Sequence, residues 1–272
     1  MHSLTGKTVV VTGHASGIGA AITAKLIDLG ALVIGVDRSD SESAPRPFFT
    51  IVGDLSTFDG VRAIADAIDR PIDVLINNAG VAATQPWRTV LAVNALAPRD
   101  LTRLLLPKFG RRPVVVTTAS QAGFRWQQNF ARADNFLAID DWDDALDSVS
   151  DLSDIDTICY SMSKEAAIVN SGNLAVDGKH IGLRSNTVSP GTVGTPLLAD
   201  FTATMGEAAI DGAAAWTGRH ATPEEIADAV LFLASDESSW ISGADLPVNG
   251  GYGSLVFRTF VAPAVSRADG QE

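Results

Sequence analysis

The chain of 272 residues has little cysteine, little charge and no long apolar run. Its single cysteine, Cys159, excludes an internal disulfide and a zinc site built from cysteines, and it favours a reducing, cytoplasmic setting. No apolar run reaches the roughly 20 residues that a helix needs to cross a bilayer, and the first residues do not form a secretory signal. The formal net charge of −12 would repel nucleic-acid phosphates and anionic membranes. We therefore expect a cytoplasmic protein that binds neither.

Apolar residues make up 46% of the chain and charged residues 19%, which suits a buried sheet covered by helices. Short β-branched runs alternate with segments that have apolar residues at helical spacing, and this predicts an α/β fold with parallel strands and right-handed crossovers. The expected strands are Thr8–Val11, Leu32–Val36, Val74–Ile76, Val114–Thr117, Leu183–Val188 and Asp245–Val248. The expected helices are Gly19–Leu29, Phe58–Ile68, Ala95–Leu106, Tyr160–Asp177 and Glu224–Ala234.

The alternation predicts one domain over residues 1–257, followed by a loosely ordered tail, 258–272. The segment Phe124–Ile158 interrupts it. Aromatic side chains stand there on a strongly acidic background, with aspartates at Asp140, Asp141, Asp143, Asp144 and Asp147. Two interpretations remain open for this insertion: a surface excursion with short amphipathic helices, or a wall or lid over a site.

A glycine-rich turn, Thr12–Gly19, joins the first expected strand to the first expected helix. Its glycines let the backbone approach a pyrophosphate, which the free N–H groups of the helix can stabilise. Asp37 ends the second strand, where a carboxylate can bind both ribose hydroxyls of an adenosine and repel a 2′-phosphate; this favours NAD over NADP. Arg38 is counter-evidence, because a guanidinium can pair with that phosphate. His14 is interpreted as a spacer and not as a base.

Tyr160 and Lys164 are four residues apart at the start of a predicted helix, so they share one face. A free phenol, with a pKa of about 10, is a poor base at neutral pH, and a neighbouring ammonium is expected to lower that pKa. Ser120 follows the fourth expected strand, at the edge of the sheet where open α/β folds bind ligands. These three side chains are therefore candidates for acid–base chemistry.

Several short motifs occur in a fixed order along residues 4–256. They are Thr12-Gly13-x-x-x-Gly17-Ile18-Gly19, Asn77-Asn78-Ala79-Gly80, Asn94, Ser120, Tyr160-x-x-x-Lys164 and Ser189-Pro190-Gly191-x-Val193-x-Thr195. This ordered set resembles the short-chain dehydrogenase/reductase family. The resemblance implies a Rossmann-like, doubly wound parallel sheet with helices on both faces, and an oxidoreductase that transfers a hydride between NAD(H) and an alcohol or its carbonyl.

The resemblance also implies roles for individual residues. Tyr160 would be the general acid/base, and Lys164 would lower its pKa and hold the nicotinamide ribose. Ser120 would bind the substrate oxygen, Asn94 would position a water in a proton relay, and Asn77 would tie neighbouring strands. No metal is implied. The implied cofactor-binding residues are Gly13, Ser16, Gly17, Ile18, Gly19, Asp37, Arg38, Asp54, Leu55, Asn78, Ala79, Gly80, Tyr160, Lys164, Pro190, Gly191, Val193 and Thr195.

The spacing of the motifs narrows the resemblance. Thirteen residues separate Gly80 from Asn94, and the insertion puts Ser120 unusually far from Tyr160. This pattern is similar to the bacterial 3α-hydroxysteroid dehydrogenase/carbonyl reductase branch and, within it, to coniferyl-alcohol dehydrogenases. The implied substrate is an aromatic, coniferyl-like or alicyclic alcohol, with a steroid as the alternative. A non-catalytic NAD-sensing regulator on the same fold is the alternative from another class.

A homodimer is expected, with a tetramer as the less favoured outcome. In many relatives the helices that begin near Asn94 and carry Tyr160 pair with their copies, but here the acidic insertion is expected to cover or remodel that face. Association is then expected through the helix Glu224–Ala234 and the last strand, Asp245–Val248. A group of apolar residues is interpreted as either a flap over the substrate or helix packing: Leu197, Leu198, Phe201, Met205 and Trp216.

Overall fold

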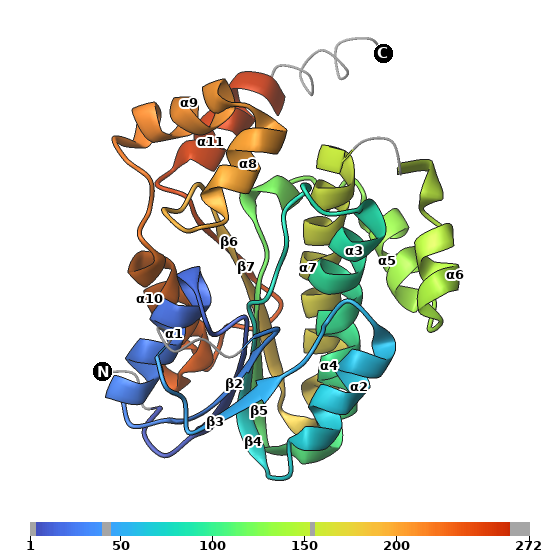
Figure 1. Ribbon diagram of the computed structural model, residues 1–272, viewed down its shortest axis with the longest axis vertical. Helices are drawn as coiled ribbons and strands as arrows, with labels where there is room; N and C mark the ends of the chain where they lie inside the picture. The colour runs from blue at the N-terminus through green and yellow to red at the C-terminus, as the bar shows by residue number, and fades with distance from the viewer. Residues whose placement is uncertain (1–3, 40–44, 153–155, 262–272) are drawn as a thin grey trace.

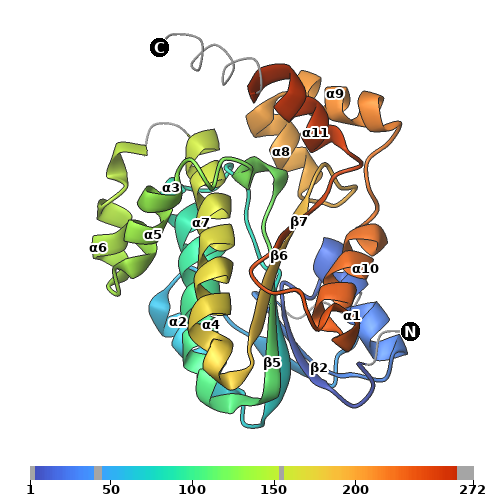
Figure 2. The ribbon, with the colours of Figure 1, turned by 180° about the vertical axis from the view of Figure 1, so that it is seen from behind.

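Seven parallel strands form one sheet in the computed structural model, which describes residues 4–39, 45–152 and 156–261 (Figures 1 and 2). The strand order is β3-β2-β1-β4-β5-β6-β7, so the order reverses between β1 and β4. The expected doubly wound parallel sheet is thereby confirmed. The strands are β1 (Thr8–Thr12), β2 (Leu32–Asp37), β3 (Phe49–Val52), β4 (Ile72–Asn77), β5 (Phe109–Thr118), β6 (Arg184–Pro190) and β7 (Asp245–Val248).

Helices cover both faces of the sheet (Figure 1). One face carries α1 (Gly17–Asp28) and α10 (Pro223–Ala234), and the other carries α2 (Phe58–Ala67), α4 (Ala97–Leu105) and α7 (Asp156–Asp177). The remaining α-helices are α3 (Trp87–Leu91), α5 (Phe130–Ala138), α6 (Trp142–Asp147), α8 (Leu198–Met205), α9 (Glu207–Thr217) and α11 (Tyr252–Val256).

The side-chain alternation along β1 shows how the two layers form. Val9 and Val11 are buried in the cluster that contains the inner residues of α1 and α10, whereas Val10 is buried in the cluster on the opposite face, with α2 and α4. Successive side chains of a strand point to opposite faces, so a run of three valines supplies both layers.

The expected elements are present, with three differences of consequence. The strand β3 was not anticipated: it is only four residues long, and Phe49 and Val52 are exposed at the edge of the sheet. Ser120 consequently follows the fifth strand and not the fourth. The helix α7 begins at Asp156, so Tyr160 lies in its second turn and not at its start.

The expected tail, 258–272, is only partly described. Helix α11 continues into a turn of π-helix, Phe257–Val261, so helical structure passes the expected boundary at residue 257. The rest of the tail, 262–272, lies outside the described residues.

The insertion forms the helices α5 and α6, which lie outside α7 on the side away from α1 and α10 (Figures 1 and 2). Its apolar side chains, among them Phe136 and Leu146, are buried in one cluster with Leu96 and Met162 of the main fold. The insertion is therefore part of the packed structure and shares a core with the helices beneath it.

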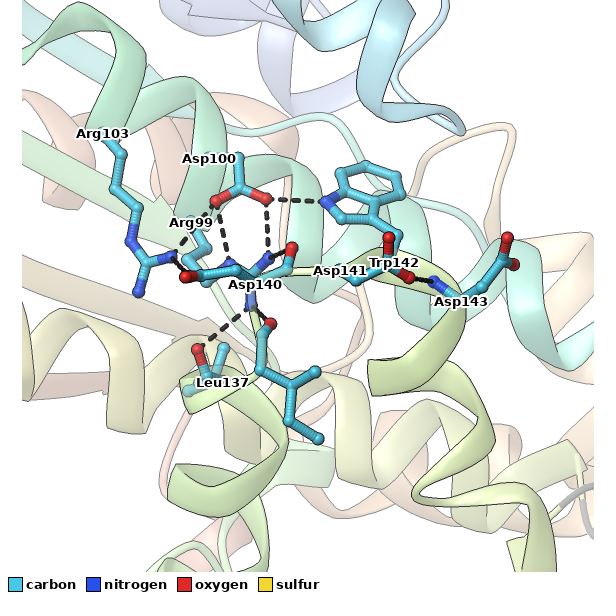
Figure 3. A network of polar contacts seen from close by, with 9 residues as sticks. Arg99, Asp100, Arg103, Leu137, Asp140, Asp141, Trp142 and Asp143 are labelled. Carbon is cyan, nitrogen blue, oxygen red and sulfur yellow. Dashed lines mark hydrogen bonds and ion pairs between the residues drawn. The ribbon is translucent and has the colours of Figure 1, made fainter.

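A buried ion pair fastens the insertion to α4 (Figure 3). Arg99, 1% exposed, donates from Nε and Nη2 to the two carboxylate oxygens of Asp100, at 2.9 and 2.7 Å. Its Nη1 donates to the carbonyls of Leu137 and Ile139, at the end of α5, at 3.0 and 2.6 Å. The indole of Trp142 donates to Asp100 Oδ2 at 2.6 Å. The guanidinium therefore neutralises Asp100 and also satisfies carbonyls that end a helix.

Candidate active site

A cleft of about 460 Å³ opens at the carboxyl edge of the sheet, beside the reversal of strand order between β1 and β4. Open α/β sheets bind their ligands at this position, because the loops there diverge to either face. Of the predicted cofactor-binding residues, all except Gly19 line this cleft.

Gly19 does not line the cleft, but the packing of the turn requires a glycine at this position. A Cβ at this position would lie 1.8 Å from the carbonyl oxygen of Gly13, so only glycine allows α1 to start so close to the turn. Gly13 has a φ of +68°, and a Cβ at this position would lie 2.9 Å from the Cα of Ala79, closer than van der Waals contact. The glycines thus bring the turn, α1 and the loop after β4 together, as the motif predicts.

The start of α1 can accept an anion. The N-cap residue, Ser16, makes no side-chain capping bond, and the first turn contains no acidic residue. The first N–H groups of a helix have no partner within it, and the positive end of the helix dipole favours negative charge. These are the donors that a dinucleotide pyrophosphate requires, so the residues present fit such a cofactor.

The carboxylate of Asp37 stands at the end of β2 and faces the cleft. Its Oδ2 accepts from the backbone N–H of Ala15 at 3.1 Å, and its Oδ1 accepts from the N–H of Arg38 at 2.7 Å. These two bonds hold the carboxylate in place with acceptor capacity left for a ribose. Arg38 lines the same cleft. The structure therefore places Asp37, which favours NAD, and Arg38, which could favour NADP, side by side.

The role expected for Asn77 needs correction. The buried Asn77 donates to Thr102 Oγ1 at 3.2 Å and so ties β4 to α4, not to a neighbouring strand. It is Asn78 that joins strand ends: its Nδ2 donates to the carbonyl of Thr12 at 3.2 Å, and its Oδ1 accepts from Thr118 Oγ1 at 3.1 Å. Asn78 therefore connects β1 and β5 while it also lines the cleft.

Tyr160, Lys164 and Ser120 meet at the inner end of the cleft. The Ser120 side chain lies close enough to the Tyr160 hydroxyl to lower its pKa, and Ser120 Oγ accepts from the N–H of Ala122 at 3.1 Å. Lys164 Nζ lies 5.7 Å from the centre of the Tyr160 ring and donates to the carbonyl of Thr118 at 3.1 Å. The three candidate side chains from two distant segments therefore share one site.

The expected fall in the pKa of Tyr160 is not found in this structure. Burial raises the pKa of the Tyr160 hydroxyl to about 12, and the Ser120 side chain only partly opposes this. Burial also lowers the pKa of Lys164 to about 8. Desolvation dominates because the charged form of each group loses water when it is buried. At neutral pH the phenol is therefore protonated and able to donate its proton.

Asn94 lies in a π-helical turn, Ala92–Leu96, that precedes α4. Such bulges commonly occur at functional sites because they turn a side chain out of the regular helix. Asn94 Oδ1 accepts from the N–H of Val81 at 2.9 Å, and its Nδ2 donates to the carbonyl of Val81 at 3.0 Å and to Ser163 Oγ at 3.1 Å. Asn94 therefore holds the loop after β4 against the helix that carries Lys164.

Two residues of this arrangement were missed from the sequence. Ser163 donates to the carbonyl of Tyr160 at 2.7 Å while it accepts from Asn94, and Thr12 Oγ1 accepts from the N–H groups of Asn78 and Ala79, both at 3.0 Å. The sequence offers little indication of these roles. Ser163 stands inside Tyr160-x-x-x-Lys164 and Thr12 opens the glycine turn, but serine and threonine are common in both positions and in many others.

A second cavity, of about 420 Å³, adjoins the cofactor cleft. Ser120, Tyr160 and Phe201 line both, so the cavities meet at the candidate catalytic side chains. Phe201 packs edge-on against Tyr160 with ring centres 5.3 Å apart. We call this second cavity the substrate cavity. The other apolar side chains that line it include Phe124, Met205, Ile210, Val248 and Tyr252.

The expected flap is therefore present only in part. Phe201 and Met205 line the substrate cavity and Leu197 lines the cofactor cleft, whereas Leu198 lines neither. Trp216 packs on Tyr252 with ring centres 6.2 Å apart. Of the described residues in the insertion, only Phe124 lines either cavity, so its helices do not form the wall or lid considered above.

Two features are absent from the described ranges. No helix there is long and apolar enough to cross a membrane. Over the same residues, no group of three or more His, Cys, Asp or Glu side chains is placed to hold a metal ion.

Two family models match the chain. One, described as short chain dehydrogenase, matches residues 7–132, and the other, described as enoyl-(acyl carrier protein) reductase, matches residues 149–253. A coniferyl-alcohol dehydrogenase from a Pseudomonas species is 32% identical over 92% of this chain and 98% of its own length.

Solved structures are similar as well. The 3-alpha-hydroxysteroid dehydrogenase from Pseudomonas sp. B-0831, complexed with NADH, has a TM-score of 0.79 and 31% identity over 93% of this chain and 99% of its own. A putative NAD(P) dependent gluconate 5-dehydrogenase from Beutenbergia cavernae, with bound NADP, has a TM-score of 0.73 and 31% identity over 93% and 98% of the two chains. Relatives of this fold thus bind either nicotinamide dinucleotide.

Proposed function

The chain belongs to the short-chain dehydrogenase/reductase family, and on that premise we propose that it transfers a hydride between NAD(H) and an alcohol or its carbonyl. The observation that carries the proposal is that Tyr160 and Ser120 lie together where the cofactor cleft meets an apolar cavity. The apolar walls favour an aromatic, coniferyl-like or alicyclic alcohol as the substrate.

In the proposed reaction, a bound nicotinamide supplies the hydride donor or acceptor. Ser120 and Tyr160 hydrogen-bond the substrate oxygen and so orient the reacting carbon. For carbonyl reduction, the Tyr160 hydroxyl donates its proton to that oxygen, and for alcohol oxidation the phenolate takes the proton back. The Lys164 ammonium stabilises the phenolate that forms, and Asn94 holds the loop that borders this end of the cleft.

NAD is proposed over NADP because of Asp37. Its carboxylate, fixed by the N–H groups of Ala15 and Arg38, has oxygens free for two ribose hydroxyls and would repel a 2′-phosphate. Among the described residues that line the cleft, Arg38 is the only cation next to this carboxylate, and its backbone N–H donates to Asp37 Oδ1.

A 3α-hydroxysteroid is the second candidate substrate. It is supported by the similarity to the 3-alpha-hydroxysteroid dehydrogenase of Pseudomonas sp. B-0831 over nearly the whole chain. Both candidates use the same acid–base side chains and differ only in the shape of the substrate that the cavity accepts.

The test is NAD⁺ reduction, followed at 340 nm, over a panel of cinnamyl, benzylic, alicyclic and steroid alcohols. The wild type should reduce NAD⁺ with at least one class, and the Tyr160→Phe variant should not. Stoichiometric NAD binding without turnover on any alcohol or on the corresponding carbonyls would overturn the proposal and favour a dinucleotide-sensing regulator.

We also propose that the enzyme is a homodimer that associates through α10 and β7. The insertion buries its apolar residues against the helix that carries Tyr160, which supports the expectation that this face is covered. The charge argument is weaker than expected, because Asp140 pairs with Arg103, and Asp143 and Asp147 pair with Arg88. Trp240, between α10 and β7, is 100% exposed, as expected of an anchor residue in an interface.

The assembly is tested by light scattering at micromolar concentration. The wild type should have the mass of a dimer, and Trp240→Glu should shift it toward the monomer. Phe48→Glu, at an exposed aromatic residue next to β3 on the opposite edge of the sheet, is the matched control and should remain dimeric. A monomeric wild type, or a dimer unaffected by Trp240→Glu, would contradict the proposed interface.

A further inference from the structure

Gln121, which follows the candidate catalytic serine directly, has a side-chain oxygen without a partner among the described residues. Its Oε1 is buried and accepts no hydrogen bond from any of them. The residue lines the substrate cavity. A buried amide oxygen that binds nothing is costly, and native proteins seldom keep one unless a ligand or another group serves it.

The position of Gln121 Oε1 shows which end of the substrate cavity it lies near. A Cβ placed on Gly191 would lie 3.5 Å from Gln121 Oε1. Gly191 lines both the cofactor cleft and the substrate cavity, as Tyr160 does. The oxygen therefore lies beside a residue that lines both cavities, so it borders the junction where hydride transfer is proposed.

The surroundings of Gln121 are mostly apolar. Phe201, Met205 and Ile210 line the same cavity and offer no hydrogen bond. A substrate group that meets the Gln121 amide must bring its own polar hydrogen. A hydroxyl suits this position best, because it can donate to Oε1 and can also accept from the amide N–H of the same side chain.

We propose that Gln121 is a specificity-determining residue that binds a second hydroxyl of the substrate, close to the carbinol that is oxidised. The substrate class is thus a diol, or the corresponding hydroxyketone, on an otherwise apolar framework. This inference rests on the proposed function, because the reacting carbinol is the one that Ser120 and Tyr160 hold. It narrows that function from alcohols in general to alcohols with a neighbouring hydroxyl.

The experiment compares indane-1,2-diol, indan-1-ol and 2-methoxyindan-1-ol as substrates for NAD⁺ reduction. The diol should be used with a kcat/KM about tenfold higher than either of the others, since one hydrogen bond to a buried polar group separates them. In Gln121→Met, which keeps the length of the side chain, the three values should become nearly equal. Gln128→Met, at an exposed glutamine that lines neither cavity, is the matched control and should keep the wild-type preference.

A second measurement separates the substrate from the cofactor as the partner of Gln121. The dissociation constant for NADH, from fluorescence titration, should be the same in wild type and Gln121→Met. If instead NADH binding weakens and the substrate preference is unchanged, Gln121 serves the nicotinamide end of the cofactor, and the proposal is overturned. It is also overturned if the wild type does not prefer the diol while it oxidises other alcohols. Absence of turnover on every alcohol would refute the proposed function itself.

Discussion

The cofactor cleft and the insertion are held in place by different kinds of contact. The cleft is built from strand ends, glycines and hydrogen bonds from backbone N–H groups to nearby side chains, such as those of Ala15 and Arg38 to the Asp37 carboxylate. The insertion is fastened by side chains, above all by the buried Arg99–Asp100 pair (Figure 3). Neither α5 nor α6 lines a cavity. Changes in the cleft should therefore alter chemistry and leave stability intact, and changes at the insertion contacts should do the opposite.

The largest effect is expected for Tyr160→Phe. The variant keeps the ring that packs on Phe201 but lacks the hydroxyl that exchanges the proton, so kcat should fall about 10²- to 10⁴-fold. Thermal melting and NADH binding should remain close to wild type. A near-normal kcat would show that Tyr160 is not the acid–base residue. A large loss of melting temperature would show that changes in the cleft also affect stability.

Arg99→Met should have the reverse signature. It leaves the carbonyls at the end of α5 without their cation and the buried Asp100 carboxylate with only the longer contact to Arg103, at 3.5 Å, which should cost about 3–5 kcal/mol in the free energy of unfolding. The matched control is Arg103→Met, at a side chain that is 46% exposed, which should cost less than about 1 kcal/mol. Urea unfolding measures the free energy of unfolding of both variants. Equal losses would show that the burial of the Arg99–Asp100 pair is unimportant.

Asp37→Ala should alter cofactor choice without unfolding the protein. Because the substitution removes the acceptor of the ribose hydroxyls and the repulsion of a 2′-phosphate, the preference for NAD over NADP in kcat/KM should fall about 10- to 100-fold. Asp69→Ala, at an exposed aspartate outside the cleft, should leave the preference unchanged. A wild type that uses NADP equally well or better would contradict the assignment of Asp37.

The smallest effect is a shift in pH dependence. Burial lowers the pKa of Lys164 to about 8, so its ammonium loses its proton at a lower pH than a free lysine does. The charge that stabilises the Tyr160 phenolate is present below this pH and lost above it, so kcat/KM for carbonyl reduction should decline above about pH 8. In Lys164→Arg the charge persists, and the decline should move to higher pH. A profile that is the same in both proteins would exclude Lys164 as its origin.

Much of the cleft could be predicted because its chemistry depends on local sequence. A glycine turn between a strand and a helix, and a carboxylate at the end of the next strand, produce nearly the same geometry wherever they occur. The partner of Asn77 was not predicted, because the sequence does not show that its side chain reaches Thr102 of α4 and not a neighbouring strand.

Other features could not be predicted because they depend on contacts between distant segments. Gln121 and Ser163 have no distinctive sequence signal, and their partners, or the lack of one, arise from the loops that surround them. The pKa of Tyr160 was expected to fall and instead rises to about 12, because desolvation depends on how completely the packed structure covers the ring.

The sequence by itself determined the fold class, the place of the cofactor cleft and the identity of the candidate catalytic side chains, because the alternation of strands and helices and the order of short motifs are local properties. Only the tertiary structure decided how the insertion is anchored, which apolar residues line the substrate cavity and which buried groups keep their charge. Those features depend on which side chains are brought together after the sheet has formed, and residues as far apart as Arg99 and Ile139 carry no common pattern along the chain.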